Sequence, residues 1–247
     1  MARGTTLTRL LDEVRAEARL SLNPAHNNQT RDQHIHVLQR EQERLWEDYN
    51  WPHLRVERFI MTEIGQRYYD PRGAKNAAGE ISGVIPVDRI ERIFFKSDGE
   101  WMPVYSGIGQ WHQAITDSAL GQHSWPVARW QVAEEDQIEV WPITDIAADP
   151  EDQTGYLKIV GIRKLNPLVA PDDRADLDDR MLALYTAGNI LAAAGSKDAE
   201  LKIEAANKRY VRLKGEQAKL KAFRMFGIGM DESARRPAIT HYRPPGV

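Results

Sequence analysis

The sequence predicts an α+β protein in which an antiparallel helical bundle carries an inserted antiparallel β domain and ends in an extended C-terminal arm. Three observations lead to this fold class. Apolar residues recur at three- and four-residue spacing in residues 1–53 and again in residues 166–224. Between them, residues 54–165 alternate with period two and are rich in turn residues. Residues 225–247 are the expected arm, and its last fourteen residues, Ala234–Val247, are basic and contain three prolines, which excludes a long helix or a central strand there.

The first part of the predicted bundle, residues 1–53, holds two amphipathic helices. The stretch TTLTRLLDEVRAEARL has Thr5 or Thr6 available as N-cap, and TRDQHIHVLQREQERLWEDYN ends where Asn50 and Pro52 stop the helix. Their apolar stripes are Leu7, Leu10, Leu11, Val14 and Ala18 in the first helix and Ile35, Leu38, Leu45 and Tyr49 in the second. Each stripe needs a partner surface, which the other helices of the bundle are expected to supply.

The second part of the predicted bundle, residues 166–224, holds the other two helices. The stretch PDDRADLDDRMLALYTAGNILAAAG is expected to be helical after Pro171 and to end at Gly195, and SKDAELKIEAANKRYVRLKGEQAKLKAF has Ser196 as candidate N-cap. The stripe of the last helix is Ile203, Ala206, Tyr210, Leu213 and Leu220. Because few residues separate the two helices, they are expected to form an antiparallel hairpin. Small residues that allow close approach are Ala187, Gly188, Ala192, Ala193 and Ala194.

The β region is expected to hold roughly six to eight short antiparallel strands. The stretches LRVERFIMTEIGQRYY and RIERIFFKSDGEWMPVY alternate as strands do, and Asp98 and Gly99 are typical of a hairpin turn. In ARWQVAEEDQIEVWP, the residues from Glu134 to Gln137 link two further strands, and GYLKIVGI is the last strand.

The composition describes a folded chain with an acidic body and a basic end. The chain has 247 residues, of which 42% are hydrophobic, and a formal net charge of −3. From Lys202 to Val247, however, eleven Lys and Arg stand against four Asp and Glu. The absence of cysteine excludes disulfides and thiolate metal sites and suits a reducing cytoplasm. We find no apolar run of membrane-spanning length and no cleavable signal peptide.

The acidic residues that follow Pro171 are the most prominent candidates for chemistry. Paired carboxylates can hold a divalent cation or act as acid and base. Acids at a helix N-terminus also complement the helix dipole and cap free N–H groups, at under about 1 kcal/mol each. We interpret them in this second way and build no enzyme on them. They are Asp172, Asp173, Asp176, Asp178 and Asp179.

No other group of residues predicts catalysis. His34 and His36 resemble a metal motif, but on a helix they point about 200° apart, so we expect helix-surface or subunit-contact positions. Nucleophile elbows, phosphate-binding loops and zincin helices are all missing from the sequence. We therefore expect no enzyme, no cofactor and no catalytic, cofactor-binding or metal-binding residue.

The seven tryptophans lie in the middle of the chain. They are Trp46, Trp51, Trp101, Trp111, Trp125, Trp130 and Trp141. Three of them precede proline, which favours an extended backbone where the indole can brace a junction. Most are expected in the core of the β region or at its joint with the helices. Their spacing from basic residues is not that of a nucleic-acid stacking platform.

The basic end of the chain has three possible uses. Its lysines and arginines can form the solvated face of the last helix, bind phosphates, or meet an acidic protein surface. The final stretch, ARRPAITHYRPPGV, is best explained as a docking arm, because a segment that orders on binding can wrap a large area. The residues expected to dock are Arg235, Arg236, Pro237, Ile239, His241, Tyr242, Arg243, Pro244 and Pro245.

Four stretches of this sequence together resemble the head-to-tail adaptor, or connector, proteins of tailed bacteriophages. They are EQERLWEDYNWPHL, DGEWMP, ARWQVAEEDQIEVWP and ADLDDRMLALYTAGNILAAAGSKDAELKIEAANKRYVRLKG, which span most of the chain. The resemblance implies a helical bundle with an inserted β domain, assembled in a homo-oligomeric ring of usually twelve copies beneath the portal protein. It also implies that a C-terminal extension, here residues 225–247, inserts against the portal.

The same resemblance implies the partners and the location. The protein is expected in the virion at the head–tail junction, after synthesis in the host cytoplasm, with no membrane contact. A downstream tail component, either a nozzle, a stopper or a tube, and tail fibres are expected to mount on the ring. Genomic DNA is expected to pass through the channel without sequence-specific binding.

The leading hypothesis is therefore a structural connector that docks on the portal and extends the DNA channel toward the tail. The main alternative is a DNA-binding or DNA-processing protein that uses the basic C-terminal arm on phosphates. A third is an enzyme that uses the cluster from Asp172 to Asp179. Salt partly separates the first two, because phosphate binding falls steeply with added salt.

Overall fold

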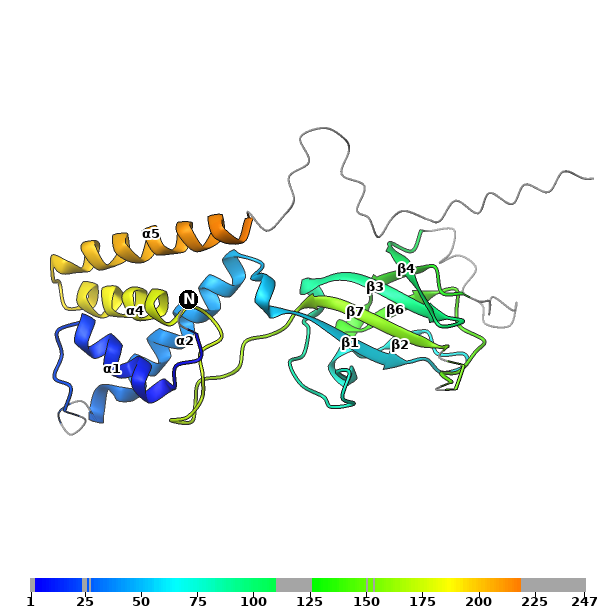
Figure 1. Cartoon of the computed structure of the whole chain (residues 1–247), viewed down its shortest axis with the longest axis horizontal. Helices are drawn as coiled ribbons and strands as arrows, with labels where there is room; N and C mark the ends of the chain where they lie inside the picture. Colours follow the sequence, from blue (N-terminus) through cyan, green and yellow to red (C-terminus); the bar gives the residue numbers. More distant parts are fainter. Residues whose placement is uncertain are drawn as a thin grey trace, which may run out of the picture. The chain divides into compact units, whose positions relative to one another are not determined.

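The computed structural model describes residues 3–23, 26, 28–109, 126–149, 151–152 and 154–218 (Figure 1). The chain divides into two units, Met1–Ala206 and Asn207–Val247, and each is described by itself. The predicted docking residues, from Arg235 to Pro245, lie outside the described residues, as do Trp111 and Trp125. The conformation and the role of the arm therefore stay predictions.

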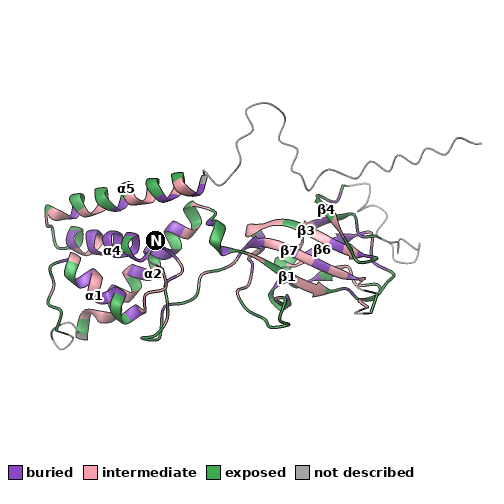
Figure 2. Ribbon diagram, viewed as in Figure 1, coloured by how far each residue is buried: buried purple, intermediate pink, exposed green. Residues whose placement is uncertain are grey.

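Four α-helices occur among the described residues. They are α1 (Leu7–Glu17), α2 (Arg31–Asp48), α4 (Asp179–Ala193) and α5 (Asp198–Ala218). Helix α4 contacts both α1 and α2, and it is buried along most of its length, as the purple ribbon in Figure 2 shows. The run ALYTAG in α4, which is buried at all six positions and has no charged residue, suits this central position, because every side of the helix meets protein.

The predicted apolar stripes are only partly confirmed. In α1 the stripe is buried from Leu7 to Val14. In α2, Leu38 and Leu45 are buried as predicted, whereas Ile35 is only half-buried. The prediction that His34 lies on the helix surface is wrong, since its side chain is buried on the face of α2 that also carries Leu38. A polar residue can share a buried stripe when its helical spacing matches, and the apolar pattern alone does not detect it.

The predicted start of the third helix is also wrong. Helix α4 begins at Asp179 and not after Pro171. Asp178 is its N-cap, because one carboxylate oxygen accepts a hydrogen bond from the backbone N of Met181 at 2.9 Å. At the next helix, Ser196 Oγ accepts from the backbone N of Asp198 at 3.3 Å, so the predicted capping serine does stand at the start of α5.

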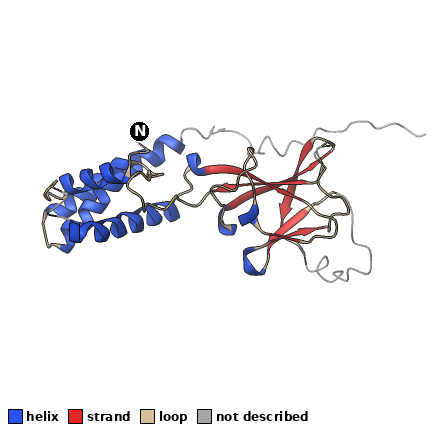
Figure 3. Cartoon of the chain, turned by 90° about the horizontal axis from the view of Figure 1, so that it is seen from below, coloured by secondary structure: helices blue, strands red, loops and turns tan. Residues whose placement is uncertain are grey.

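In the part of the chain that the structure describes, seven strands form one sheet in the order β1-β7-β3-β4-β5-β6-β2. Figure 3 shows the strands in red. The strands are β1 (Arg55–Met61), β2 (Tyr68–Tyr69), β3 (Ile90–Ser97), β4 (Glu100–Ser106), β5 (Arg129–Val132), β6 (Ile138–Trp141) and β7 (Tyr156–Ile162). The predicted hairpin turn is confirmed, since Ser97 pairs with Glu100 and both Asp98 and Gly99 have positive φ. Neighbouring strands are antiparallel except β4 and β5, which are parallel.

The predicted architecture is therefore wrong. The structure is α+β with a seven-stranded mixed sheet that holds the main core, and it is not a helical bundle with a small antiparallel β insertion. Turn residues identify hairpins between consecutive strands but say nothing of strands that pair across a long connection. The chain between Ser106 and Arg129 is long enough to come back beside the last residues of β4 in the same direction, which allows parallel pairing.

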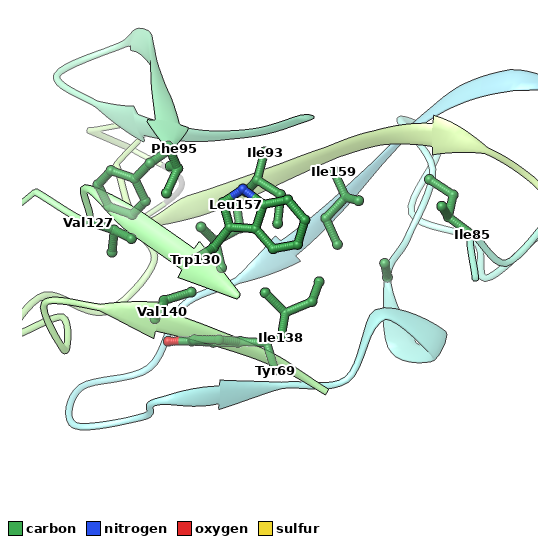
Figure 4. Close-up of a cluster of buried hydrophobic side chains, with 12 residues drawn as sticks. Tyr69, Ile85, Ile93, Phe95, Val127, Trp130, Ile138, Val140, Leu157 and Ile159 are labelled. Carbon is green, nitrogen blue, oxygen red and sulfur yellow. The ribbon is translucent and has the colours of Figure 1, made fainter. Parts of the chain in front are cut away.

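The main core lies inside the curled sheet (Figure 4). Tyr69 of β2 and Leu157 of β7 belong to the same buried cluster although their strands are far apart in the sheet order, so the sheet must curl around the cluster. Burial raises the pKa of Tyr69 to about 12, and its hydroxyl donates to the backbone O of Gln66 at 3.1 Å. The other members include Ile85, Ile93, Phe95, Val127, Trp130, Ile138, Val140 and Ile159.

A joint of aromatic and charged groups connects α2 to the sheet. The guanidinium of Arg89, just before β3, lies 4.6 Å from the centre of the Trp46 ring and donates to Asn50 Oδ1 at 2.6 Å and to the backbone O of Glu47 at 2.9 Å. Trp46 Nε1 in turn donates to the backbone O of Arg163, just after β7, at 3.1 Å. The prediction that tryptophans brace this joint is confirmed for Trp46.

Candidate functional site

The predicted acidic cluster is spread over several structural roles. Asp176 accepts from both terminal nitrogens of Arg163 and from the backbone N of Asn166, the latter at 2.7 Å. Asp173 closes a loop by accepting from two backbone N–H groups, and the buried Asp179 accepts from Thr5. Burial raises the pKa of Asp179, an effect that the hydrogen bonds from Thr5 oppose. Only Asp178 and Asp179 lie at the N-terminus of the helix, so the interpretation of all five as helix-end charges is wrong for the others.

The histidines of α2 do not form a metal site with their neighbours. In the part of the chain that the structure describes, no three His, Asp or Glu side chains are grouped closely enough to hold a metal ion. His34 is buried and His36 is exposed, as expected for residues two positions apart on a helix. Among the described helices, none is both long and apolar enough to cross a membrane.

The most distinctive surface feature is a hollow of about 810 Å³ on the outer face of the sheet. We call it the lysine–aromatic hollow. It is lined by side chains of β1, β3, β4 and β7 and by the loop 73–79. Its charged and large apolar lining residues include Glu57, Phe59, Met61, Lys75, Lys96, Trp101 and Lys158.

Strand register places these residues on one face. Phe59 of β1 pairs with Lys158 of β7, which pairs with Phe94 of β3. Two residues along, Lys96 of β3 pairs with Trp101 of β4, so the two rows lie side by side. Side chains alternate between the two faces of a strand. The sequence neighbours of these residues point into the core, so both rows point away from it. The outer face thus combines aromatic rings with lysines.

Lysine ammonium groups lie over the aromatic rings of the hollow. Lys158 Nζ is 4.6 Å from the centre of the Trp101 ring and 4.9 Å from that of Phe94, and Lys96 Nζ is 5.4 Å from Trp101 on the neighbouring strand. The side chain of Lys158 is only 16% exposed, and its nearest carboxylate, that of Glu57, is 3.9 Å away and mostly exposed. These cation–π contacts hold positive charge at the floor of an apolar hollow.

The loop that borders the hollow is held in place by backbone hydrogen bonds. Lys75 and Phe59 exchange two bonds of 2.8 and 2.9 Å, which extend the sheet locally beyond the edge strand β1. Asn76 Oδ1 accepts from the backbone N of Ala78 and of Glu80, both at 2.9 Å, and so fixes the turn. The rim that carries Lys75 is therefore preformed.

The hollow suits the binding of an anionic group that carries an apolar part. Among the residues that line it, three lysines face the single carboxylate of Glu57, so a carboxylate or a phosphate finds net positive charge. Met61, 57% exposed, adds apolar surface next to the aromatic rings. A pocket with an apolar lining and a few polar groups binds its ligand through apolar contacts and through charge.

A second hollow, of about 650 Å³, lies beside the turn that joins β5 and β6. Its lining includes Glu134, Glu135 and the buried Glu139, together with Tyr68 and Val132. Arg67 donates to Glu139 through Nε at 2.6 Å, and Gln131 Nε2 donates to the other oxygen at 2.6 Å. The exposed carboxylates of the turn thus lie beside Glu139, whose side chain is held by these hydrogen bonds.

Sequence reasoning missed the lysine–aromatic hollow. The strands that form it were predicted, but Trp101 was expected in the core or at the joint, and it lies on the outer face. The useful signal was the alternation FFKS in β3 and LKIV in β7, which places Phe94, Lys96 and Lys158 on the face opposite to the core residues Phe95 and Leu157. The sequence matches no protein-family model and no curated protein.

Proposed function

We propose that this protein is a structural virion component: a ring-forming head-to-tail adaptor of a tailed bacteriophage. In this proposal the C-terminal arm docks on the portal protein, the ring extends the DNA channel, and its far side is the platform for tail components. The sequence resemblance is the source of these partners, and the ring of twelve copies comes from the same source.

The observation that best supports the proposal is the joint between α2 and the sheet. The stretch EQERLWEDYNWPHL, which carries part of the resemblance, supplies the groups around Arg89, namely Trp46, Glu47 and Asn50. Several bonds and a ring contact converge there and fix the direction in which the sheet leaves the helix. A connector needs such a fixed direction, because each subunit of a ring must present its surfaces at the same angle.

The charge distribution supports docking by many weak contacts. The body is acidic and the end of the chain is basic, so arms of neighbouring subunits can engage the same partner. In a ring these contacts add, because the second and later arms bind at high effective concentration. Affinity then depends on assembly more than on any single site.

The lysine–aromatic hollow keeps the DNA-binding alternative open. Lysines beside half-buried aromatic rings also suit nucleic-acid strands, whose bases stack on the rings while ammonium groups meet phosphates. This alternative predicts binding to DNA that falls steeply with salt and that does not need the portal.

Binding to the portal protein encoded by the same phage tests the proposal. Full-length chain and a variant in which Ala234–Val247 is replaced by a Gly/Ser segment of equal length are titrated against assembled portal. We expect the variant to keep its circular dichroism spectrum and to lose portal binding, since the arm contributes contacts and not core. Electron microscopy of the complex is expected to show a ring below the portal. Unchanged portal affinity in the variant would refute the docking arm, and salt-sensitive DNA binding without portal binding would favour the alternative.

A further inference from the structure

The end of the sheet at which β1 stops exposes two isoleucine side chains. Ile64, in the segment 62–66 that follows β1, is 68% exposed, and Ile146, in the segment 144–149 that follows β6, is 38% exposed. Neighbouring exposed apolar side chains are typical of a surface that binds another protein segment. We call the surface formed by residues 62–66 and 144–149 the isoleucine end.

Backbone hydrogen bonds hold the two segments of the isoleucine end side by side. Gly65 N donates to the backbone O of Thr144 at 3.0 Å, and Ala148 N donates to that of Thr62 at 2.9 Å. Gly155 lies beneath them with φ of 74°, and a Cβ atom added to it would lie 2.6 Å from Ala148 Cα, so only glycine fits there. The surface is therefore preformed, and little conformational entropy is lost on its side when a partner docks.

Carboxylates surround the two isoleucines. Met61 of β1 and Lys96 of β3 both pair with Tyr156 of β7, so the hairpin between β3 and β4 lies at the same end of the sheet. The segments that meet at this end contain seven acidic residues and no lysine or arginine. In the part of the chain that the structure describes, none of the seven carboxylates forms an ion pair. They are Glu63, Asp98, Glu100, Asp145, Asp149, Glu151 and Asp152, in residues 62–66, 98–100 and 144–155.

The C-terminal end of the chain, residues 234–247, has the complementary composition. It contains three arginines and no Asp or Glu, and its apolar residues Ile239 and Tyr242 lie between the arginines. Arginine suits carboxylates because its guanidinium donates two parallel hydrogen bonds. The fifteen residues 219–233 before this segment can span up to about 50 Å, which is enough to reach another copy of the chain.

We infer that residues 234–247 of one copy dock on the isoleucine end of a second copy. The arginines meet the surrounding carboxylates, and Tyr242 covers Ile64 and Ile146. The two surfaces differ, so the contact is head-to-tail and can join many copies. The inference goes beyond the adaptor proposal, because the contact needs only copies of this chain. The portal and the isoleucine end then compete for the same segment.

Disulfide formation between two full-length proteins tests the contact, because the chain has no native cysteine. Protein with Ala238→Cys is mixed with protein with Ala147→Cys, an exposed position of the isoleucine end, and oxidised mildly. Mass spectrometry of the peptides measures the disulfide between the two positions, which forms only when the two chains touch there. The matched control replaces Ala147→Cys by Ser106→Cys, exposed at the opposite end of β4, and is expected to give at least about tenfold less of this disulfide.

Further substitutions in the Ala147→Cys protein test the chemistry of the contact. Neutralising three exposed carboxylates is expected to lower the disulfide yield at least about tenfold, because the arginines lose their partners. Ile64→Ser is expected to lower it at least about threefold, since the apolar contact is lost. Circular dichroism checks that each variant keeps its fold. The neutralising substitutions are Glu63→Gln, Asp145→Asn and Glu151→Gln.

A matched control makes the same change of charge away from the isoleucine end. It carries Glu43→Gln, Asp88→Asn and Asp172→Asn, all at exposed positions, and its disulfide yield is expected to equal that of the Ala147→Cys protein. An equal loss of yield in this control and in the Glu63, Asp145 and Glu151 variant would show that net charge alone drives the contact, and the inference would be wrong.

The possible outcomes separate this inference from the adaptor proposal. The disulfide between two chains without portal binding supports the contact and counts against the adaptor. Portal binding without the disulfide overturns the contact and leaves the adaptor in place. A single chain that carries both Ala238→Cys and Ala147→Cys is the remaining probe. If this chain forms the disulfide while the mixture does not, the segment docks within its own chain, and the inference of a contact between copies is wrong.

Discussion

Gly188 of α4 is so close to Ile203 of α5 that a Cβ atom placed on the glycine would lie 2.7 Å from Ile203 Cγ1. The same atom would lie 3.5 Å from the backbone N of Ile203, so the helix α5 itself limits the space. Close approach through small residues was predicted for this helix pair. Gly188 and its neighbour Ala187, which is buried in a cluster with Ala199 of α5, supply it, whereas Ala192 to Ala194 are exposed.

Gly188→Ala is expected to destabilise the protein although alanine favours helices. Helix propensity contributes about 1 kcal/mol in favour of alanine, but overpacking against α5 costs about 1–3 kcal/mol. We expect a net loss of about 1 kcal/mol in urea unfolding. Adding Ile203→Ala should recover part of that loss, which a double-mutant cycle measures.

Gly215→Ala in α5 is the matched control, because nothing lies within 4 Å of its added Cβ. This substitution is expected to stabilise the helix by up to about 1 kcal/mol. If Gly188→Ala stabilised the protein as much as Gly215→Ala does, the close packing of the two helices would be wrong.

The stability of the protein is expected to fall in mild acid because of His34. Burial, and then the positive charge of Arg15, lower the pKa of His34 in the folded protein. As pH falls below about 6.5, the unfolded chain therefore binds a proton that the folded chain binds less readily, and the free energy of unfolding decreases. The slope for one such proton is at most about 1.4 kcal/mol per pH unit.

Chemical unfolding at several pH values measures this slope. His34→Gln is expected to flatten it between pH values near neutrality and the folded pKa. His36→Gln, on the exposed side of the same helix, should leave the slope of the native sequence in place. An identical pH dependence in native protein and His34→Gln would contradict the assignment.

Asp176 and Asp172 are expected to differ strongly in their effect on stability, although the sequence places them in one cluster. Asp176 accepts from Arg163 and from the backbone N of Asn166, and its side chain is 9% exposed. Asp176→Ala leaves the guanidinium of Arg163 without this carboxylate and is expected to cost about 3 kcal/mol. Asp172 is exposed, so Asp172→Ala should stay within about 0.5 kcal/mol.

Thermal and urea unfolding of the two variants give the comparison. Similar small effects for both would mean that the contact between Arg163 and Asp176 contributes little, as the sequence-based estimate for helix-end charges implied.

The sequence predicted the local elements better than their assembly. Periodicity and turn residues identified the two strands joined at Asp98 and Gly99. They also identified the helices in residues 1–53 and 166–224. They did not find the parallel pairing of Tyr105 with Arg129, because a pairing across a long connection leaves no local pattern. The helix boundary at Asp179 was missed for a related reason. Asp173 and Asp176 accept hydrogen bonds from loop residues, which compete with the helix for them.

The candidate site depends on the same non-local information. Phe59, Lys158 and Trp101 come from strands far apart in the sequence, and only the register of β1, β7, β3 and β4 brings them to one hollow. The alternation of side chains along β7 shows that Lys158 and Leu157 face opposite sides of the sheet. It does not show which residues of other strands lie beside them. The burial of His34 was also not predicted, because the burial of a polar residue depends on how the helices pack and not on the residue type.

The binding energy of the arm on the portal is expected to depend on Tyr242 and on the arginines of the arm. Tyr242 is followed by Pro244 and Pro245, which limit the conformations that are lost on docking, and a rigid aromatic ring buries a large area at low entropic cost. Tyr242→Ala is therefore expected to weaken portal binding by about 2 kcal/mol or more. Arginine forms two-pronged bonds with carboxylates that lysine matches poorly, so Arg235→Lys with Arg236→Lys should also weaken binding although the charge is kept.

A binding titration against portal distinguishes geometry from charge. The matched control neutralises lysines between Lys208 and Lys221, which lie before the arm, and is expected to change the affinity little. If both arm variants bound like the native chain while this control lost binding, the interaction would depend on charge alone. Such an interaction does not need the fixed geometry of Tyr242 and the arginines, and it would favour phosphate binding by the basic end over a docking arm.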